Sequence, residues 1–163
     1  MIGLVPMSRE CLVALGDGDL LLAGNLCELS LPDAFLDERH VWGYFAGKLE
    51  ADPRIENWLV NAVVRTDQVV VGHAGFHGPP DESGTVEIGY TTLEEHRGHG
   101  VAKAAVGLLV DRSVGEHEVR TIRANVAQVN TASQAVLAPH GFVLIGEAPE
   151  RNEGTELIFE RPA

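Results

Sequence analysis

Residues 85–112 contain a β-rich run, a loop with two glycines and an apolar, alanine-rich stretch in direct succession. The run is TVEIGYTT at 85–92, the loop includes HRGHG at 96–100, and VAKAAVGLLVDR follows at 101–112. Where a strand passes through a short loop into a helix, the first amides of the helix lack intrahelical partners and carry partial positive charge. This succession therefore predicts an α/β fold with an anion-binding loop at residues 97–102.

The spacing of the loop residues excludes two common nucleotide-binding motifs. A mononucleotide P-loop needs Ser or Thr directly after its lysine, whereas Lys103 is followed by Ala104. A dinucleotide-binding loop needs a third glycine at the position that Lys103 occupies. For the loop considered by itself, an ordinary strand-to-helix turn without a ligand stays open as an alternative.

The rest of the chain alternates helical spacing with β-rich runs, which predicts a mixed sheet with helices packed on it. Gly16 and Gly18 should interrupt the first helix, and a helix that starts near Asn130 should stop near Pro139, with Gly141 in the left-handed conformation. The predicted strands are 57–65, 68–76, 85–92, 120–127, 142–147 and 156–160, and the predicted helices are 8–26, 39–50, about 101–112 and 130–139.

Short connections predict two antiparallel hairpins, one across Thr66-Asp67 and one across Asn152-Glu153-Gly154. No internal repeat or linker divides the chain, so residues 1–163 are expected to form a single domain.

The balance of charges limits the classes of partner. The chain has 12 Lys and Arg against 24 Asp and Glu, a formal net charge of -12 at pH 7. Nucleic-acid binding depends on clustered cationic side chains, so no nucleic-acid partner is expected. The acidity favours cationic substrates such as amines, and a simple contribution to solubility is the alternative.

Apolar runs such as Leu20–Ala23 are far shorter than the roughly 20 residues of a membrane span. With no secretory start either, we expect a cytoplasmic protein without a membrane partner, and Cys11 and Cys27 as free thiols. His73 and His77 lie four residues apart, and in extended chain this spacing is about 13 Å, which is too far for one metal ion to bridge. No metal site is therefore expected.

The loop motif and two longer segments around it resemble a known protein family. Arg97-x-x-Gly100-x-Ala102 resembles the pyrophosphate-binding Gln/Arg-x-x-Gly-x-Gly/Ala motif of the GCN5-related N-acetyltransferase (GNAT) superfamily. The segment GPPDESGTVEIGYTTLEEHRGHGVAKAA is similar to the fourth strand and following helix of that superfamily, and ANVAQVNTASQAVLAPHGFVLIGE to its fifth strand and next helix. The form of the second segment resembles the branch with ribosomal-protein alanine and serine N-acetyltransferases. The resemblance covers about residues 75–147.

The resemblance implies a GNAT-like fold, with a central sheet of about six to seven strands whose fourth and fifth strands splay apart. It implies acetyl-CoA (coenzyme A) as cofactor, with the pantetheine arm paired to the main chain of Tyr90, Thr91 and Thr92. Asn130 is implied as a further cofactor-side residue, and a helix cap is its alternative role. The implied pyrophosphate site consists of the amides of Arg97, Gly98, His99, Gly100, Val101 and Ala102.

The implied reaction transfers an acetyl group to a primary amine. An aliphatic ammonium has a pKa of about 10.4, so a base must remove its proton, and Glu87 is the candidate. Many relatives have a tyrosine seven residues after the asparagine to protonate the leaving thiolate, but Leu137 stands there. Ser133, one turn earlier, is the substitute candidate, with a purely capping role as its alternative. Amides near Tyr90 and Thr91 would stabilise the oxyanion.

The acceptor amine could belong to a protein N-terminus or to a small molecule, and a homodimer stays open. A non-catalytic acyl-CoA-binding or sensing module of the same fold is the alternative function.

Overall fold

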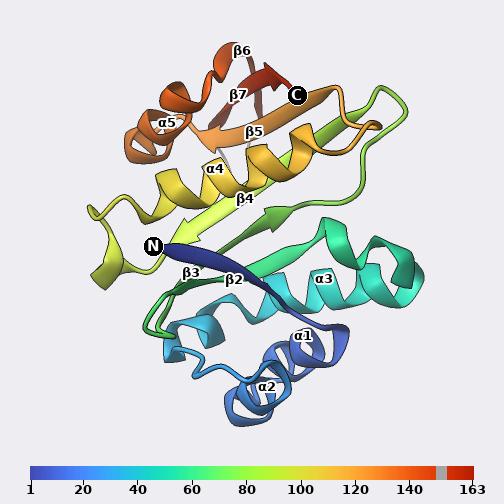
Figure 1. Ribbon diagram of the computed structural model, residues 1–163, viewed down its shortest axis with the longest axis vertical. Coiled ribbons are helices and arrows are strands. Elements are labelled where there is room, and N and C mark those ends of the chain that lie inside the picture. Colours follow the sequence, from blue (N-terminus) through green and yellow to red (C-terminus); the bar gives the residue numbers. More distant parts are fainter. Residues whose placement is uncertain (150–153) are drawn as a thin grey trace.

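Seven strands form one mixed sheet in the order β1-β2-β3-β4-β5-β7-β6 (Figure 1), in a computed structural model that describes residues 1–149 and 154–163. Strands β4 and β5 run parallel, and the other neighbouring pairs are antiparallel. The predicted α/β class with a mixed sheet is therefore confirmed. The strands are β1 (Ile2–Pro6), β2 (Val60–Arg65), β3 (Val70–Phe76), β4 (Thr85–Thr92), β5 (Thr121–Ala127), β6 (Val143–Pro149) and β7 (Thr155–Pro162).

Helices cover both faces of this sheet. One face carries α1 and α3, and the other carries α4 and α5. The α-helices are α1 (Arg9–Gly16), α2 (Leu20–Cys27), α3 (Arg39–Ala51), α4 (Val101–Val114) and α5 (Thr131–Leu137), and the 3-10 helices are η1 (Asp33–Glu38), η2 (Pro53–Trp58), η3 (Glu94–His96) and η4 (Ala138–His140).

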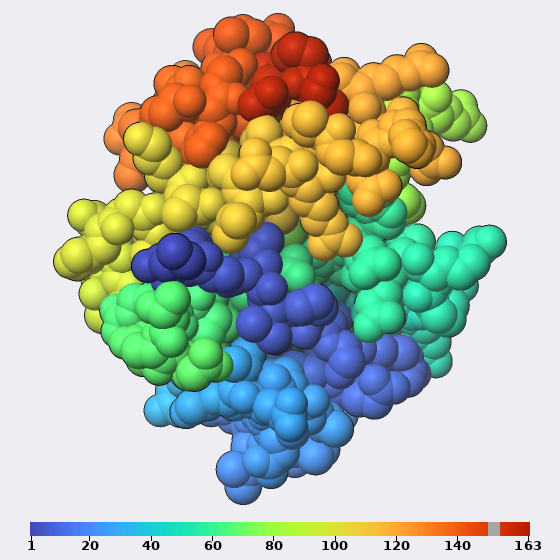
Figure 2. Space-filling view, in the orientation of Figure 1, coloured from blue at the N-terminus to red at the C-terminus, as the bar shows by residue number. Residues whose placement is uncertain are grey.

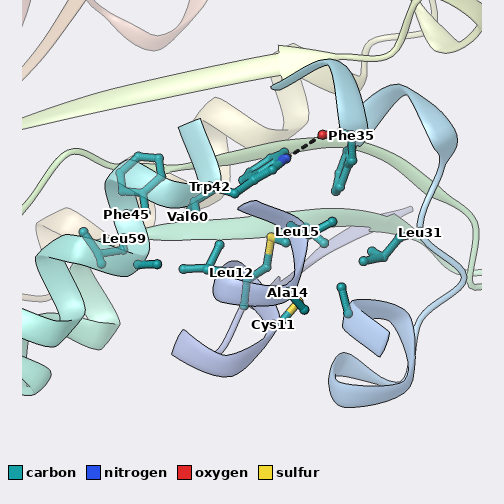
Figure 3. Packing of buried hydrophobic residues seen from close by; sticks show 14 of the residues in the cluster. Cys11, Leu12, Ala14, Leu15, Leu31, Phe35, Trp42, Phe45, Leu59 and Val60 are labelled. Atoms are coloured by element: carbon teal, nitrogen blue, oxygen red, sulfur yellow. Dashed lines mark hydrogen bonds between the residues drawn. The ribbon is translucent and has the colours of Figure 1, made fainter. Parts of the chain in front are cut away.

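Each face of the sheet has its own hydrophobic cluster. Leu12 of α1 and Trp42 of α3 pack against Val60 and its neighbours on β2 (Figure 3), and the Trp42 indole N–H donates to the carbonyl oxygen of Phe35 at 2.6 Å. The second cluster lies between the sheet and α4, where the alternating residues Ile122, Ala124 and Val126 of β5 are buried. Arg123 and Asn125, which alternate with these residues, therefore point to the opposite face of the sheet, the face that carries α3.

Strands β4 and β5 pair only over their first three residues. The register runs from Thr85 opposite Thr121 to Glu87 opposite Arg123 and then stops, although both strands continue. The predicted splay is confirmed, and it starts immediately after Glu87.

The N-terminal half differs most from the sequence prediction. Strand β1 was not predicted; it pairs with β2, with Ile2 opposite Arg65, and lies against α4 (Figure 2). The predicted strand 57–65 starts only at Val60, because η2 takes up Asn57 and Trp58. The predicted helix 8–26 is interrupted as expected, with Gly18 at φ +82° between α1 and α2.

The C-terminal elements follow the prediction closely. Helix α5 gives way to a 3-10 turn that contains Pro139, and Gly141 takes the left-handed conformation at φ +80°. Strands β6 and β7 pair as predicted, while Asn152 and Glu153 of the expected turn lie outside the described residues. None of the helices in the described part of the chain combines the length and hydropathy needed to cross a bilayer.

Candidate active site

The loop between β4 and α4 presents a row of backbone donors. The first helical hydrogen bond of α4 runs from the amide of Ala104 to the carbonyl of Gly100, at 3.0 Å. The amides of residues 98–103 have no protein partner within the described residues, and no side chain caps the helix. Gly98 and Gly100 hold φ angles of +74° and +79°, and a Cβ at either position would meet no atom within 4 Å. The main chain at both glycines is therefore open to the close approach of a ligand.

The side chains of this loop bind their own main chain. The Arg97 guanidinium donates to the carbonyl of Thr92 at 3.3 Å, and Nδ1 of His99 lies 2.7 Å from the carbonyl oxygen of Arg97. These contacts hold the turn between the end of β4 and the start of α4 while they leave the amide row free. Such a row fits a group with several anionic oxygens, such as a pyrophosphate.

A side-chain bridge connects β4 to α5 beyond the point where β4 and β5 part. The Tyr90 hydroxyl donates to the carbonyl oxygen of Ser133 at 2.9 Å. Burial raises the pKa of Tyr90 to about 12, so the phenol stays neutral at physiological pH. The bridge places the start of α5 beside the section of β4 that has no partner on β5.

The start of α5 is capped by its own asparagine. Oδ1 of Asn130 accepts a hydrogen bond from the amide of Ser133 at 3.1 Å, so the capping role considered for Asn130 is present. The Ser133 hydroxyl has no hydrogen-bond partner within residues 1–149 and 154–163. Leu137, at the position where the resemblance implied a tyrosine, is fully buried in the core.

Glu87 projects from the opposite face of β4, toward α3. Its Oε1 atom lies 3.2 Å from Nδ1 of His77, and the two side chains are 34% and 47% exposed. This contact with His77 lowers the pKa of Glu87, and the positive charges of Arg123 and Lys48 lower it further. Glu87 is therefore ionised and held by an imidazole, rather than being an isolated carboxylate on the surface of a strand.

Sequence reasoning considered His77 only as a metal ligand. The pairing of β3 with β4 sets Phe76 opposite Ile88, and the His77 amide donates to the Glu87 carbonyl at 2.9 Å. The two strands were predicted at 68–76 and 85–92, but their pairing was not, so the sequence did not place His77 beside Glu87. His73 belongs to a separate contact, with Nε2 2.9 Å from Oε2 of Glu38.

Asn125 was also missed. It lies on β5 two residues beyond Arg123, on the face that Glu87 occupies and past the last pairing between β4 and β5. Its Oδ1 atom is buried and accepts no hydrogen bond from the described part of the protein. A buried carbonyl oxygen of this kind is suited to an external N–H or O–H donor.

Comparisons with known proteins match most of the chain. Residues 29–143 match the family model described as an acetyltransferase (GNAT) domain. An uncharacterized N-acetyltransferase of Bacillus subtilis, YjdG, is 33% identical over 95 residues, which are 58% of this chain and 55% of that protein. The chain spans about half the length of the curated relatives it matches.

Two solved structures show the same fold. Mycobacterium smegmatis RimJ in complex with CoA-disulfide has a TM-score of 0.70 at 23% identity, and the match covers 99% of this chain and 82% of RimJ. Ribosomal-protein-S5-alanine acetyltransferase from Vibrio fischeri has a TM-score of 0.69 at 19% identity, and the match covers 99% of this chain and 92% of that protein.

Proposed function

The chain belongs to the GNAT family of acetyltransferases, and on this premise we propose that it transfers an acetyl group from acetyl-CoA to a primary amine. The observation that carries the proposal is the unpartnered row of amides at residues 98–103, which lies beside the section of β4 that has parted from β5. A cofactor that is anionic at one end and extended at the other fits this combination of an anion site and an open strand edge.

The residues of the loop and of β4 would hold the cofactor. The amides from Gly98 to Ala102 would bind the pyrophosphate, with the open glycines allowing close approach of the main chain. The Arg97 amide, which the sequence-based expectation included, donates instead to the Glu94 carbonyl at 3.2 Å. The main chain of Tyr90, Thr91 and Thr92 would pair with the pantetheine arm, and Asn130 would lie on the cofactor side. The RimJ structure, which is a complex with CoA-disulfide, supports a CoA-type ligand. Acetyl-CoA would supply the activated acetyl thioester.

The chemistry needs a proton acceptor, an oxyanion site and a path for the leaving thiolate. Glu87 and its partner His77 are the candidates beside the acceptor nitrogen. Amides near Tyr90 and Thr91 would stabilise the oxyanion. The unbonded hydroxyl of Ser133, at the start of α5, would donate to the thiolate.

The charge of the chain supports an amine acceptor. A net charge of -12 attracts ammonium groups to the surface. The Vibrio fischeri protein is named for the alanine of a ribosomal protein, which supports a protein N-terminus as one kind of acceptor, and small amines are the other.

Two measurements test the proposal. Calorimetric titration of the wild-type chain with acetyl-CoA should give saturable binding. A Gly98→Asp variant, which places a carboxylate beside the amide row, should bind acetyl-CoA at least tenfold more weakly. The control is Gly43→Asp in α3, where a Cβ also meets no atom within 4 Å. It adds the same negative charge away from the loop and should leave acetyl-CoA affinity unchanged. Free thiol should then appear when an amine is added, across a panel of peptides, polyamines and amino acids. Binding without thiol release on any amine would favour the non-catalytic module, and absence of binding would refute both.

A further inference from the structure

We infer that His77 is the group that accepts the proton of the acceptor amine, and that Glu87 is the residue that positions His77. This inference rests on the proposed transfer to an amine and names the catalytic base of that same site. It differs from the sequence-based expectation, which made Glu87 itself the base.

The contact between the two side chains determines which ring nitrogen is free. Nδ1 of His77 lies 3.2 Å from Oε1 of Glu87. An ionised carboxylate accepts hydrogen bonds but has no proton to donate, so this contact favours the neutral tautomer with its proton on Nδ1, and that tautomer keeps an unshared electron pair on Nε2. A base oriented in this way by a carboxylate follows the same logic as other catalytic pairs of histidine and acid.

The free nitrogen lies at the point where the sheet opens. Nε2 of His77 is 2.7 Å from the position that a Cβ atom on Gly89 would take. Gly89 is two residues past Glu87, the last residue of β4 that pairs with β5. The absence of a side chain at Gly89 therefore allows the imidazole to lie over the strand where an extended cofactor would pair with the main chain.

The imidazole is also the better base of the two. The contact with His77, and then the charges of Arg123 and Lys48, keep the pKa of Glu87 below its ordinary value, which weakens the carboxylate as a proton acceptor. General bases are most effective when their pKa lies near the working pH, and the lowered pKa of Glu87 moves that carboxylate away from it. Glu87 is better suited to stabilising the imidazolium.

The neighbouring elements fix the ring and set its charge environment. From α3, the Lys48 ammonium donates to the His77 carbonyl and lies 5.1 Å from the centre of the Tyr44 ring, and the Phe45 ring centre is 6.4 Å from that of His77. From β5, Arg123 is paired with Glu160 of β7 at 2.5 Å. The charged or titratable groups that these contacts place around His77 are thus Glu87, Lys48, Tyr44, Arg123 and Glu160.

The proton transfers balance with the transfer of the acetyl group. Nε2 of His77 takes one proton from the acceptor ammonium, and the released electron pair of the amine forms the N–C bond to the acetyl carbon. The C–S bond breaks with its electron pair on sulfur. The Ser133 hydroxyl gives its proton to that sulfur and is reprotonated by the second amine proton, so that the net products are the amide and the free thiol. The imidazolium then returns its proton to solvent.

The test compares His77→Gln, Glu87→Gln and the control His117→Gln, whose histidine is exposed in the turn after α4. With a saturating amine, His77→Gln should lower kcat about 100-fold or more, and Glu87→Gln about tenfold, while acetyl-CoA affinity measured by calorimetry stays unchanged. Glu87→Gln removes the charge that stabilises the imidazolium, so the acid limb of its pH–kcat profile should move to lower pH. In His77→Gln that limb should disappear.

A second variant covers the case in which His77→Gln does not fold. Gly89→Ala leaves the reacting groups intact but places a methyl carbon 2.7 Å from the present position of Nε2, so the ring must shift, and the variant should lower kcat at least tenfold without loss of acetyl-CoA binding. The inference is overturned if Glu87→Gln loses more activity than His77→Gln, if His77→Gln keeps the wild-type pH profile, or if Gly89→Ala keeps the wild-type rate. Wild-type protein that binds acetyl-CoA and acetylates no amine would overturn the proposed function and, with it, this inference.

Discussion

The buried side-chain oxygen of Asn125 lowers the stability of the fold, because no donor in the described part of the protein satisfies it. A buried oxygen without a hydrogen-bond donor costs about 1–3 kcal/mol, and asparagine is also disfavoured in strands. Asn125→Val should therefore raise the free energy of unfolding by about 1 kcal/mol, or the melting temperature by about 2–4 °C. Thermal unfolding measures this effect.

The same substitution should weaken the site. Asn125 lies on the face of β5 that also carries Arg123, next to the opening beyond Glu87, so loss of its oxygen should raise the KM for the amine severalfold. Asn125→Asp, which keeps an acceptor oxygen, is the matched control for KM. A lower melting temperature in Asn125→Val would contradict the idea that the oxygen lacks a partner.

The residues of the cofactor loop and those of the acceptor face differ in how far sequence could predict them. Gly98 and Gly100 were predicted because their role depends on local backbone conformation, which a short motif encodes. His77 and Asn125 owe their positions to strand register and to the point where β4 leaves β5. Register is a property of two distant segments, so neither residue stands out in a single sequence.

At the scale of the elements, the turn into α4 depends on the left-handed conformation of Gly100. A side chain at φ +79° costs roughly 1–2 kcal/mol, although a Cβ there would collide with nothing in the protein. Gly100→Ala should therefore lower the melting temperature and weaken acetyl-CoA binding, because a relaxed turn would misalign the amide row. Gly43→Ala in α3 is the control, and its melting temperature should not fall. Unchanged stability and affinity in Gly100→Ala would contradict this account.

The contact between η1 and β3 makes stability depend on pH. The Glu38 carboxylate, 2.9 Å from Nε2 of His73, has a pKa that this contact holds below the ordinary value. The unfolded chain then binds more protons than the folded one in the acidic range, so the contribution is complete above the ordinary carboxyl pKa and is lost as the pH falls through the lowered one. Glu38→Gln should cost about 1–2 kcal/mol at pH 7 in urea unfolding.

The difference between Glu38→Gln and the wild type should shrink toward zero as the pH falls through the lowered pKa of Glu38, because below it the carboxyl is protonated in both the folded and the unfolded state. Asp33→Asn, at the other end of η1, removes a charge from an exposed residue and provides the control. A pH-independent difference for Glu38→Gln would show that packing, rather than the contact with His73, accounts for the loss.

Most elements were predictable where the pattern is local, and the exceptions have physical causes. The succession of β4, loop and α4 was predicted with its boundaries nearly intact. Strand β1 has five residues, and its pairing partner on β2 lies some 60 positions away, so nothing local marks it. Helix η2 starts at Pro53, and the Asp52 side chain accepts a hydrogen bond from the Arg54 amide. These two features favour a 3-10 helix up to Trp58, although the composition from residue 57 onward is typical of a strand.

At the scale of the whole molecule, both hydrophobic clusters share one sheet, and we propose that residues 1–163 act as a single domain. The α3 face of that sheet would receive the acceptor, while the cofactor would enter between the diverging halves of β4 and β5. Changes at Glu87 or His77 should then affect the acceptor and leave cofactor affinity intact. Changes at the loop of residues 97–102 should have the opposite effect.

The net charge of -12 should make the rate of acetylation depend on the charge of the acceptor. A field of this sign should raise the encounter rate of polycationic amines and lower that of amines that also carry a carboxylate. Because salt at 0.15 M limits such fields to about 8 Å, kcat/KM for a polyamine should fall severalfold between 0.02 and 0.5 M NaCl. For a zwitterionic amino acid, kcat/KM should change little over the same range of salt. The measurement is the ratio of kcat/KM for the polyamine to kcat/KM for the amino acid at each salt concentration. Equal salt dependence for both acceptors would assign the acidity to solubility alone.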